Sequence, residues 1–211
     1  MKNTFLKKKN NLIKLIAIFI MPLLIMSCAI QEESWTSSWK KYEVEAIENT
    51  KIWYENNKPT ETALFSPDGT EHVLIKPEWT NAFATKNDKF EIIETDIMSY
   101  GRLLFLNEDC RAKYEETKDP KYQQCYTRFV FRTNRETGET VGFLMTIVPD
   151  LKWLEKSNFK PFMEATYLYR SEYLGGMVLF HEMDGRYSNG WVYENGKIVY
   201  TVNSLNANHS E

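Results

Sequence analysis

This chain of 211 residues contains few of the residue types that carry catalysis or bind metals. It has three histidines and three cysteines, and no two histidines have the spacing of metal ligands on one helix or strand. It lacks the Gly-x-Ser-x-Gly motif of serine hydrolases and any glycine-rich loop that would hold a phosphate. Carboxylates are numerous, but a catalytic pair of them cannot be inferred without geometry. The sequence therefore does not favour an enzyme.

Two short motifs near residue 182 resemble metal sites but have simpler explanations. His181-Glu182 lacks the second histidine of a zinc-protease helix and falls in a predicted strand, where we expect His181 on the solvent face. Asp184-Gly185 with Ser188 and Asn189 can be drawn as a calcium loop, but the alternating acids of such a loop are missing. A turn is the better interpretation, and we expect no metal and no cofactor.

Long hydrophobic runs are also scarce, and the notable one spans residues 15–26. A basic segment with five lysines and no acidic residue precedes it, and Ser27-Cys28 follows it. A membrane-spanning helix needs about 20 apolar residues, and Pro22 interrupts this run. A secretory signal fits better, with an uncleaved anchor or a buried core helix as the alternatives.

The order of basic segment, apolar run, small residue and cysteine resembles the lipobox signal of bacterial lipoproteins. The resemblance implies removal of residues 1–27 and acylation of Cys28, for example with palmitate. Because each buried methylene contributes about 0.8 kcal/mol, several acyl chains would anchor the protein firmly to a membrane. We interpret residues 28–37 as an acidic tether. Gln31-Glu32-Glu33 resembles the export signal of Bacteroides-type lipoproteins, which implies the outer face of the outer membrane, although any solvated tether has a similar composition.

Net charge argues against nucleic acid as a partner. The chain has 26 basic and 29 acidic residues, and loss of the five signal lysines leaves 21 against 29, a net charge of −8. Proteins that bind nucleic acid derive most of their affinity from lysine and arginine on phosphates. Solubility is the simplest explanation of the acidic balance.

Cys110 and Cys125 remain once Cys28 is assigned to the lipid. In an oxidising compartment two cysteines are most simply interpreted as a disulfide. The residues between them are polar, and we expect strands at 102–107 and 126–133 on either side. The disulfide would then close a hairpin loop, with a contribution of about 3 kcal/mol. A catalytic thiol paired with His72 or His181 is the alternative.

Periodicity predicts an early helix and then a series of strands. Ser38 is a candidate N-cap, residues 56–59 end the helix, and a second short helix is predicted from Pro77. The apolar stripe of the first helix consists of Trp39, Tyr42, Ala46, Thr50 and Trp53. Besides the two strands flanking the cysteines, we expect strands at 90–97 and 140–148, a turn with left-handed Gly138, and a short helix capped by Asp150.

The C-terminal segment predicts two hairpins, with turns at Asp184-Gly185 and Asn195-Gly196. Two-residue loops would place Val178 opposite Trp191, and Trp191 opposite Tyr200. One face should then form the core. Its members are Val178, Phe180, Tyr187, Trp191, Tyr193, Ile198, Tyr200 and Val202. A bulge at residues 188–190 would change part of this register. The candidate binding residues are His181, Arg186, Ser188 and Trp191.

Three segments together resemble a family of uncharacterised lipoproteins from Bacteroides and related bacteria: Gly142–Asp150, Gly176–Gly185 and Asn189–Lys197. That resemblance carries over no catalytic residue. We expect one α+β domain at residues 38–204, with the N-terminal helix packed on a mainly antiparallel, hairpin-connected sheet, and a disordered tail at 205–211. In element order it is similar to cystatin-like and NTF2-like folds.

Three functions are consistent with these features. The favoured one is a non-enzymatic surface lipoprotein that binds a glycan, a peptide or an envelope protein, because aromatic side chains stack on sugars as well as they fill cores. The second is a hydrolase based on acidic residues or on Cys125 with His181. The third is an accessory subunit of an envelope complex, with a hairpin edge as its interface.

Overall fold

A computed structural model describes residues 40–59, 61–66, 69–161 and 165–202. The predicted signal peptide, Cys28, the tether, the proposed cap Ser38 and the tail at 205–211 lie outside the described residues. In the part of the chain that is described, none of the helices is long and apolar enough to cross a membrane.

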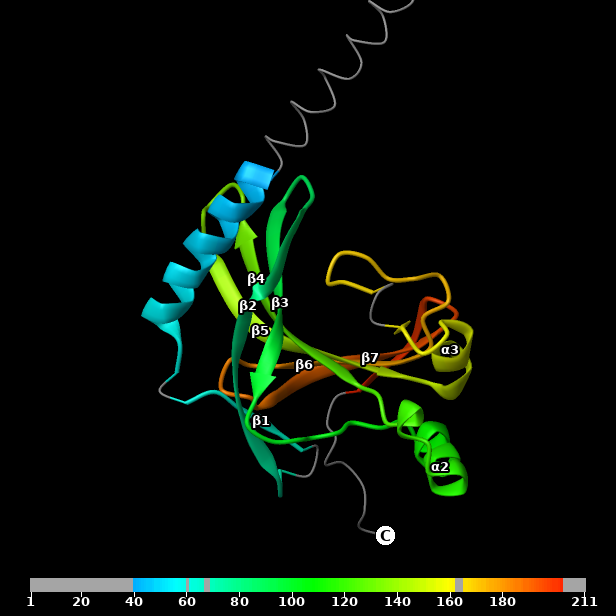
Figure 1. Cartoon of the computed structure of the whole chain (residues 1–211). Coiled ribbons are helices and arrows are strands. Elements are labelled where there is room, and N and C mark those ends of the chain that lie inside the picture. The colour runs from blue at the N-terminus through cyan, green and yellow to red at the C-terminus, as the bar shows by residue number, and fades with distance from the viewer. Residues whose placement is uncertain (1–39, 60, 67–68, 162–164, 203–211) are drawn as a thin grey trace, which may run out of the picture. The chain divides into compact units, whose positions relative to one another are not determined.

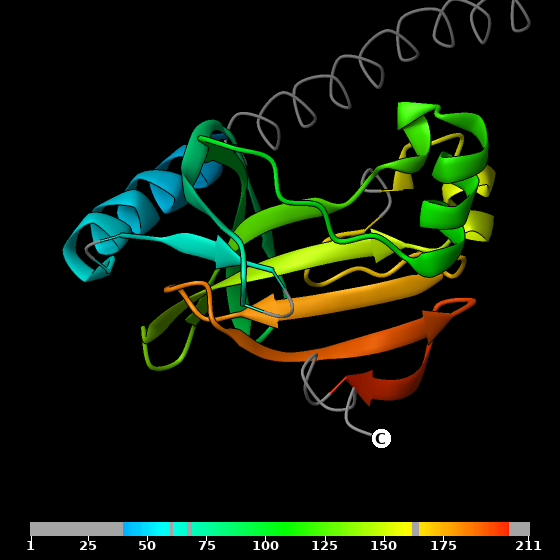
Figure 2. The same ribbon diagram turned by 90° about the horizontal axis from the view of Figure 1, so that it is seen from below.

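The domain is built on one antiparallel sheet of eight strands, whose spatial order is their order in the chain. Figures 1 and 2 show that this sheet is strongly curled. The strands are β1 (Ala63–Phe65), β2 (His72–Lys86), β3 (Phe90–Ser99), β4 (Tyr126–Asn134), β5 (Thr140–Pro149), β6 (Gly176–His181), β7 (Tyr187–Glu194) and β8 (Lys197–Val202). The prediction of a mainly antiparallel, hairpin-connected sheet is therefore confirmed, and β3, β4 and β5 lie where the sequence placed them.

The predicted helix at Pro77 is wrong, because this segment is part of β2. Proline has no N–H to donate, so a strand tolerates it where no neighbouring strand would accept that hydrogen bond. β1 pairs only with residues 72–74 of β2, so Pro77 lies beyond β1 and has just one neighbouring strand, β3. The side chain of Trp79 then stacks on Phe131 with ring centroids 5.5 Å apart.

Residues 102–107 are not a strand, and helix α2 (Glu108–Thr117) follows them. The polar composition between the two cysteines had favoured a loop, and in the structure Cys110 is the only buried residue of α2. Asn107 caps the helix through its side-chain oxygen, which accepts from the N–H of Asp109. A short 3-10 helix, η1 (Pro120–Tyr122), leads on to β4.

The predicted disulfide is absent, since Cys110 and Cys125 are free thiols. Cys110 lies on the inner side of α2, where its Sγ atom is 3.5 Å from the carbonyl oxygen of Pro149. The Cys125 Sγ atom instead accepts a hydrogen bond from the N–H of Phe105 at 3.4 Å. The unforeseen helix α2 thus directs one sulfur toward the end of β5 and leaves the other beside residues 103–105.

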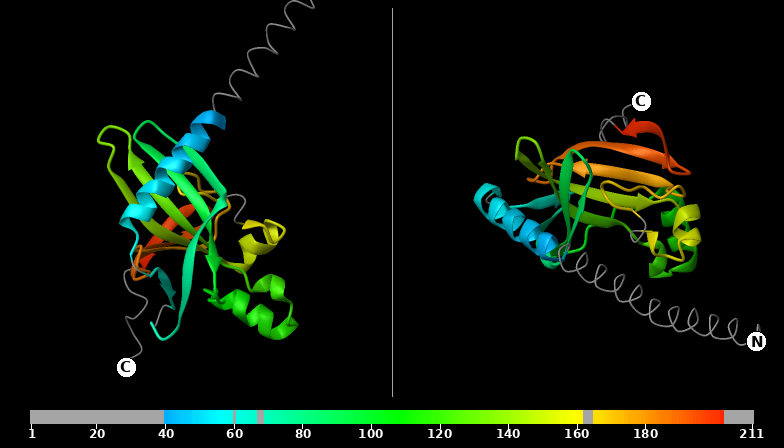
Figure 3. Two further views of the ribbon diagram at one scale, coloured as in Figure 1. Left: turned by 60° about the vertical axis from the view of Figure 1, so that its left-hand side comes forward. Right: turned by 90° about the horizontal axis from the view of Figure 1, so that it is seen from above.

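Helical structure also covers residues 40–57. The helix therefore stops within residues 56–59, where the sequence predicted its end. Ala46, Thr50 and Tyr54 are buried there. The Tyr54 ring contacts Phe129 and Phe131, with both centroid distances at 5.9 Å. Figure 3 shows this helix and the curled sheet from two further sides.

Both faces of the sheet are buried at its centre. One face packs against residues 165–175, which we call the crossing loop, and against helix α3 (Leu151–Lys156). Its buried residues are Ile92, Val130, Met145, Ile147, Trp153, Ala165, Leu174, Val178, Phe180 and Tyr193. The opposite face carries Phe129, Phe131, Leu144 and Leu179. As predicted, the side chain of Asp150 caps α3 by accepting from the N–H of Trp153 at 2.7 Å.

The two C-terminal hairpins agree with the predicted register only in part. Val178 pairs with Trp191 as expected, and Asn195 and Gly196 both have positive φ. A register shift between Val192 and Tyr193 places Trp191 opposite Thr201 instead of Tyr200.

The exposure of β8 corrects the predicted core face. Ile198 is 55% exposed and Tyr200 62% exposed, although both were expected in the core. β8 lies at one edge of the sheet, and neither residue belongs to the buried cluster beneath the crossing loop. The apolar alternation of this strand therefore does not indicate burial.

Candidate ligand pocket

A pocket of about 350 Å³ lies where β4, β5, β6 and β7 approach the crossing loop. Its lining residues are Arg132, Val141, Gly142, Phe143, Tyr167, Phe180, His181, Glu182, Ser188, Asn189 and Trp191. Three of the four candidate binding residues from the sequence, His181, Ser188 and Trp191, thus border one pocket. The fourth, Arg186, is not among them: it lies in the β6–β7 turn and pairs with Asp184 at 2.6 Å.

A β-bulge shapes the mouth of this pocket. Phe180 pairs with Asn189, but His181 pairs with Tyr187, which leaves Ser188 as the extra residue of β7. Such a bulge bends its strand and redirects the side chains near it. The sequence signal for the bulge was the Ser-Asn-Gly run at 188–190.

Glycines on β5 and β7 allow side chains to pack closely on these strands. A Cβ atom on Gly142 would lie 2.8 Å from the Met183 sulfur. A Cβ atom on Gly190 would lie 2.9 Å from a methyl carbon of Leu179. Both separations are shorter than normal van der Waals contact, so a larger residue at either position would displace the end of a neighbouring side chain.

Four aromatic rings form a continuous apolar wall. Phe143 contacts Tyr167 with centroids 5.3 Å apart and Phe180 at 5.8 Å. Phe180 in turn contacts Trp191 at 5.0 Å in an edge-to-face arrangement. Ring pairs of this kind stabilise one another beyond their buried area, so the four rings support one another without a ligand.

Arg132 is the cationic group of the pocket. Its guanidinium lies 5.0 Å from the centroid of Phe90, and its Nη1 atom donates to the Tyr167 hydroxyl at 3.2 Å. A guanidinium has five N–H donors. The Arg132 side chain is half-buried and lines the pocket, so its other donors face a ligand that enters there.

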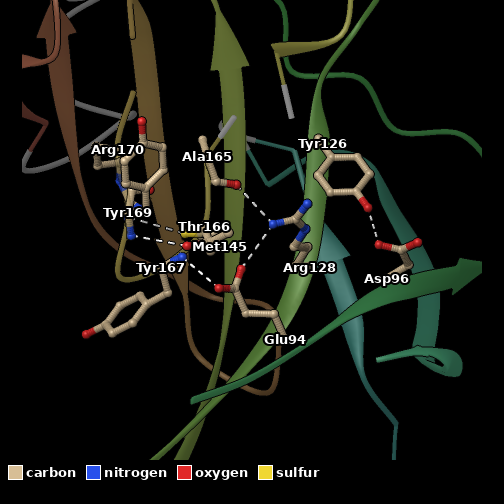
Figure 4. A network of polar contacts seen from close by, with 10 residues as sticks. All are labelled: Glu94, Asp96, Tyr126, Arg128, Met145, Ala165, Thr166, Tyr167, Tyr169 and Arg170. Atoms are coloured by element: carbon tan, nitrogen blue, oxygen red, sulfur yellow. Dashed lines mark hydrogen bonds and ion pairs between the residues drawn. The ribbon is translucent and has the colours of Figure 1, made fainter. Parts of the chain in front are cut away.

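A buried ion pair holds the crossing loop in position next to the pocket (Figure 4). Glu94 is fully buried; its Oε2 atom is 3.1 Å from Arg128 Nη1, and its Oε1 atom accepts from the backbone N–H of Tyr167 at 2.8 Å. Arg128 also donates to the carbonyl oxygen of Ala165 at 3.0 Å. Both charged residues therefore form hydrogen bonds with the backbone of the crossing loop, and these bonds hold Tyr167 in position.

Burial raises the pKa of the Glu94 carboxyl, while the Tyr167 N–H and the charge of Arg128 act in the opposite direction. Sequence analysis missed this pair, although a signal for it exists. Ile92 and Glu94 lie two residues apart in one strand and therefore share a face. A charge on the same face as a buried isoleucine needs a partner.

The expectation that His181 faces solvent is wrong, because it is 1% exposed. Its ring is packed between Phe105 at 5.7 Å and Tyr187 at 5.6 Å, so the sheet is covered on this side as well. Burial lowers its pKa to about 4, and its Nδ1 atom has no hydrogen-bond partner. At neutral pH His181 is therefore an uncharged residue of the core.

The thiols are poorly suited to catalysis. Burial raises the pKa of Cys110 to about 11 and also raises the pKa of Cys125. A catalytic cysteine needs the opposite shift, because the thiolate is the nucleophile. Across the described residues, no group of three or more His, Cys, Asp or Glu side chains is arranged to hold a metal ion.

A second hollow, of about 230 Å³, lies beside α3. Its polar groups already serve the fold. Asp150 caps the helix, and the Lys156 ammonium lies 3.4 Å from the centroid of Tyr173.

Comparisons with known protein families, with curated proteins and with solved structures each found no match. The function is therefore inferred from the pocket itself.

Proposed function

We propose that this protein is a lipid-anchored, extracytoplasmic lipoprotein of the outer membrane that binds a small ligand and does not catalyse a reaction. The observation that carries the binding role is the pocket, in which an aromatic wall stands beside an arginine with accessible donors. Concave, mostly apolar sites with a few convergent polar groups are the usual form of ligand sites.

The anchor is proposed from the sequence. Lipidation at Cys28, after removal of residues 1–27, would place the domain on a membrane through the tether at 28–37. Intact-mass measurement of the mature protein should find an acylated N-terminal cysteine, and Cys28→Ala should release the protein from the membrane fraction. Recovery of an unprocessed chain without acyl groups would contradict both the anchor and the outer-membrane location.

The binding role is tested with the full-length lipoprotein in detergent. Titration with an envelope extract should change tryptophan fluorescence, and Trp191→Ala should abolish that change. Tyr100→Ala is the matched control, because Tyr100 is 72% exposed and does not line the pocket. Equal responses of the two variants would refute this pocket as the binding site.

We also propose that residues 46–57 of the N-terminal helix pack on the sheet. The contacts of Tyr54 with Phe129 and Phe131 support this arrangement. Ala46→Glu should then destabilise the domain, because it places a charge at a position that is 5% exposed. Chemical denaturation measures the effect, and an unchanged midpoint would contradict the proposal.

One observation favours a second candidate, an accessory subunit of an envelope complex. The edge strand β8 exposes Ile198, Val199 and Tyr200, and an exposed edge is able to pair with a strand of another chain. Mild crosslinking in cells should then recover a stoichiometric partner that is lost in Val199→Pro. Repeated recovery of the protein alone would exclude this role.

A further inference from the structure

We propose that the pocket recognises an acidic carbohydrate, with a uronic acid carboxylate on Arg132 and the sugar ring against the aromatic wall. This inference rests on the proposed binding function and assigns it a ligand class.

Arg132 differs from Arg128 and Arg186 in its partners. Arg128 is paired with Glu94 and Arg186 with Asp184, whereas Arg132 contacts a phenol and a phenyl ring. Its guanidinium therefore retains a full positive charge beside apolar rings, in a domain whose expected net charge is negative. A planar guanidinium matches a carboxylate with two parallel hydrogen bonds.

The position of Arg132 is fixed before a ligand binds. Tyr167 accepts its hydrogen bond, and the backbone of Tyr167 is held by the buried Glu94. Phe90 supports the guanidinium from another side. A side chain that is already held in place loses less entropy when a ligand binds. This favours Arg132 as a binding residue over an arginine that moves freely on the surface.

The aromatic wall provides a flat apolar surface next to this charge. Trp191 and Phe143 are partly buried and pack against the core cluster, so each keeps some ring area at the pocket. The C–H-rich face of a pyranose ring is apolar enough to pack on such rings. A carboxylate with an attached ring thus matches both features together.

The polar residues of the pocket favour a sugar over an aromatic acid. The pocket lining also includes three polar residues, Ser188, Asn189 and Glu182. Their side chains offer hydrogen-bond donors and acceptors to the hydroxyl groups of a sugar. These three side chains are exposed, and an aromatic acid has no hydroxyl groups with which to bond them. The negative charge of Glu182 also disfavours ligands with several adjacent charges, such as polyphosphates. A volume of about 350 Å³ is at the small end of ligand sites, which suits one or two sugar units.

Isothermal titration of the full-length lipoprotein in detergent tests this assignment. The probes are a galacturonic acid dimer and a hyaluronan disaccharide, each compared with its carboxyl-reduced form, and indole-3-acetate as an aromatic acid. We expect at least one acidic oligosaccharide to bind about 10- to 100-fold more tightly than its reduced form, the range for a hydrogen bond to a charged group. Indole-3-acetate should bind more weakly than that oligosaccharide.

Variants separate the role of Arg132 from general damage to the fold. Arg132→Gln should bind the acidic and reduced sugars equally weakly, and Arg132→Lys should keep only part of the preference. Arg186→Gln is the matched control and should behave as the wild type, because Arg186 lies outside the pocket. Thermal unfolding checks that each variant is folded.

Other outcomes overturn the assignment. Equal affinity for acidic and reduced sugars, tighter binding of indole-3-acetate, or no binding of any probe would each refute an acidic carbohydrate. The proposed binding function would survive these results if Trp191→Ala still abolished the fluorescence response to an envelope extract. It would fail separately if the wild type gave no such response.

Discussion

Replacement of His181 should change how the stability of this domain depends on pH. The side chain is 1% exposed, and burial lowers its pKa from 6.5 to about 4. In the unfolded chain the same imidazole takes up a proton near pH 6.5. Between these two values the unfolded state binds more protons, so the free energy of unfolding must fall as the pH falls.

The size of this effect follows from the separation of the two pKa values. Each pH unit contributes about 1.4 kcal/mol, so the interval from 6.5 to about 4 corresponds to roughly 3 kcal/mol at most. Stability from this source is complete above pH 6.5 and is lost progressively toward pH 4. A loss of this size is a large fraction of the 5–15 kcal/mol typical of a domain.

Urea denaturation followed by tryptophan fluorescence, at pH values from 7.5 to 4, measures the dependence. His181→Leu should show a smaller loss of stability over this range, by about 3 kcal/mol relative to the wild type. The comparison concerns slopes, so a change in baseline stability of the variant does not affect it. Glu94, whose pKa is raised, is present in both proteins, and its contribution therefore cancels. Parallel curves for the two proteins would refute the neutral, buried state of His181.

Three further outcomes are expected. Glu94→Gln should cost about 3–5 kcal/mol in urea unfolding because it leaves Arg128 buried without its partner charge, and adding Arg128→Met should recover part of the loss; additive losses would contradict the coupling. Gly185→Ala should cost about 2 kcal/mol or more in the free energy of unfolding, because its Cβ would lie 1.4 Å from the backbone oxygen of Ala63. Gly138 also has a positive φ but faces open space, so Gly138→Ala should cost about 1 kcal/mol. Equal losses would contradict the close contact at Gly185. Peptide mapping of the native protein should find the two cysteines of the domain unlinked and slow to alkylate at pH 8, and a disulfide-linked peptide would contradict the free thiols.

The sheet was predictable where local residues determine it. Residues 126–133 and 140–148 are rich in β-branched and aromatic side chains, and Asn195-Gly196 has the positive φ that a two-residue turn requires. The segment from Pro77 to Phe83 misled the sequence analysis, because a proline and a following acid also occur at helix starts. Pro77 fits into β2 because β1 is short and pairs only with residues 72–74. This is a feature of the tertiary structure and cannot be read from the local sequence.

The candidate site was predictable in part, for a related reason. Ser188 and Trp191 lie on a strand whose approximate register follows from its turns. Arg132 and Tyr167 are 35 residues apart, and no periodicity brings them together. Their meeting depends on the buried contact between Glu94 and the crossing loop, which local sequence patterns do not encode.

The order of the sheet has a consequence for how the domain is assembled. Among the described residues, every strand bonds only to the strands that precede and follow it in the chain, so the strand pairs are able to form in the order in which they occur in the sequence. Folding through such neighbouring contacts needs few long-range loop closures. The ligand pocket uses residues of β4, β5, β6 and β7, so it is complete only after the penultimate strand has joined. A chain interrupted before β7 would hold much of the hydrophobic core and still be unable to bind.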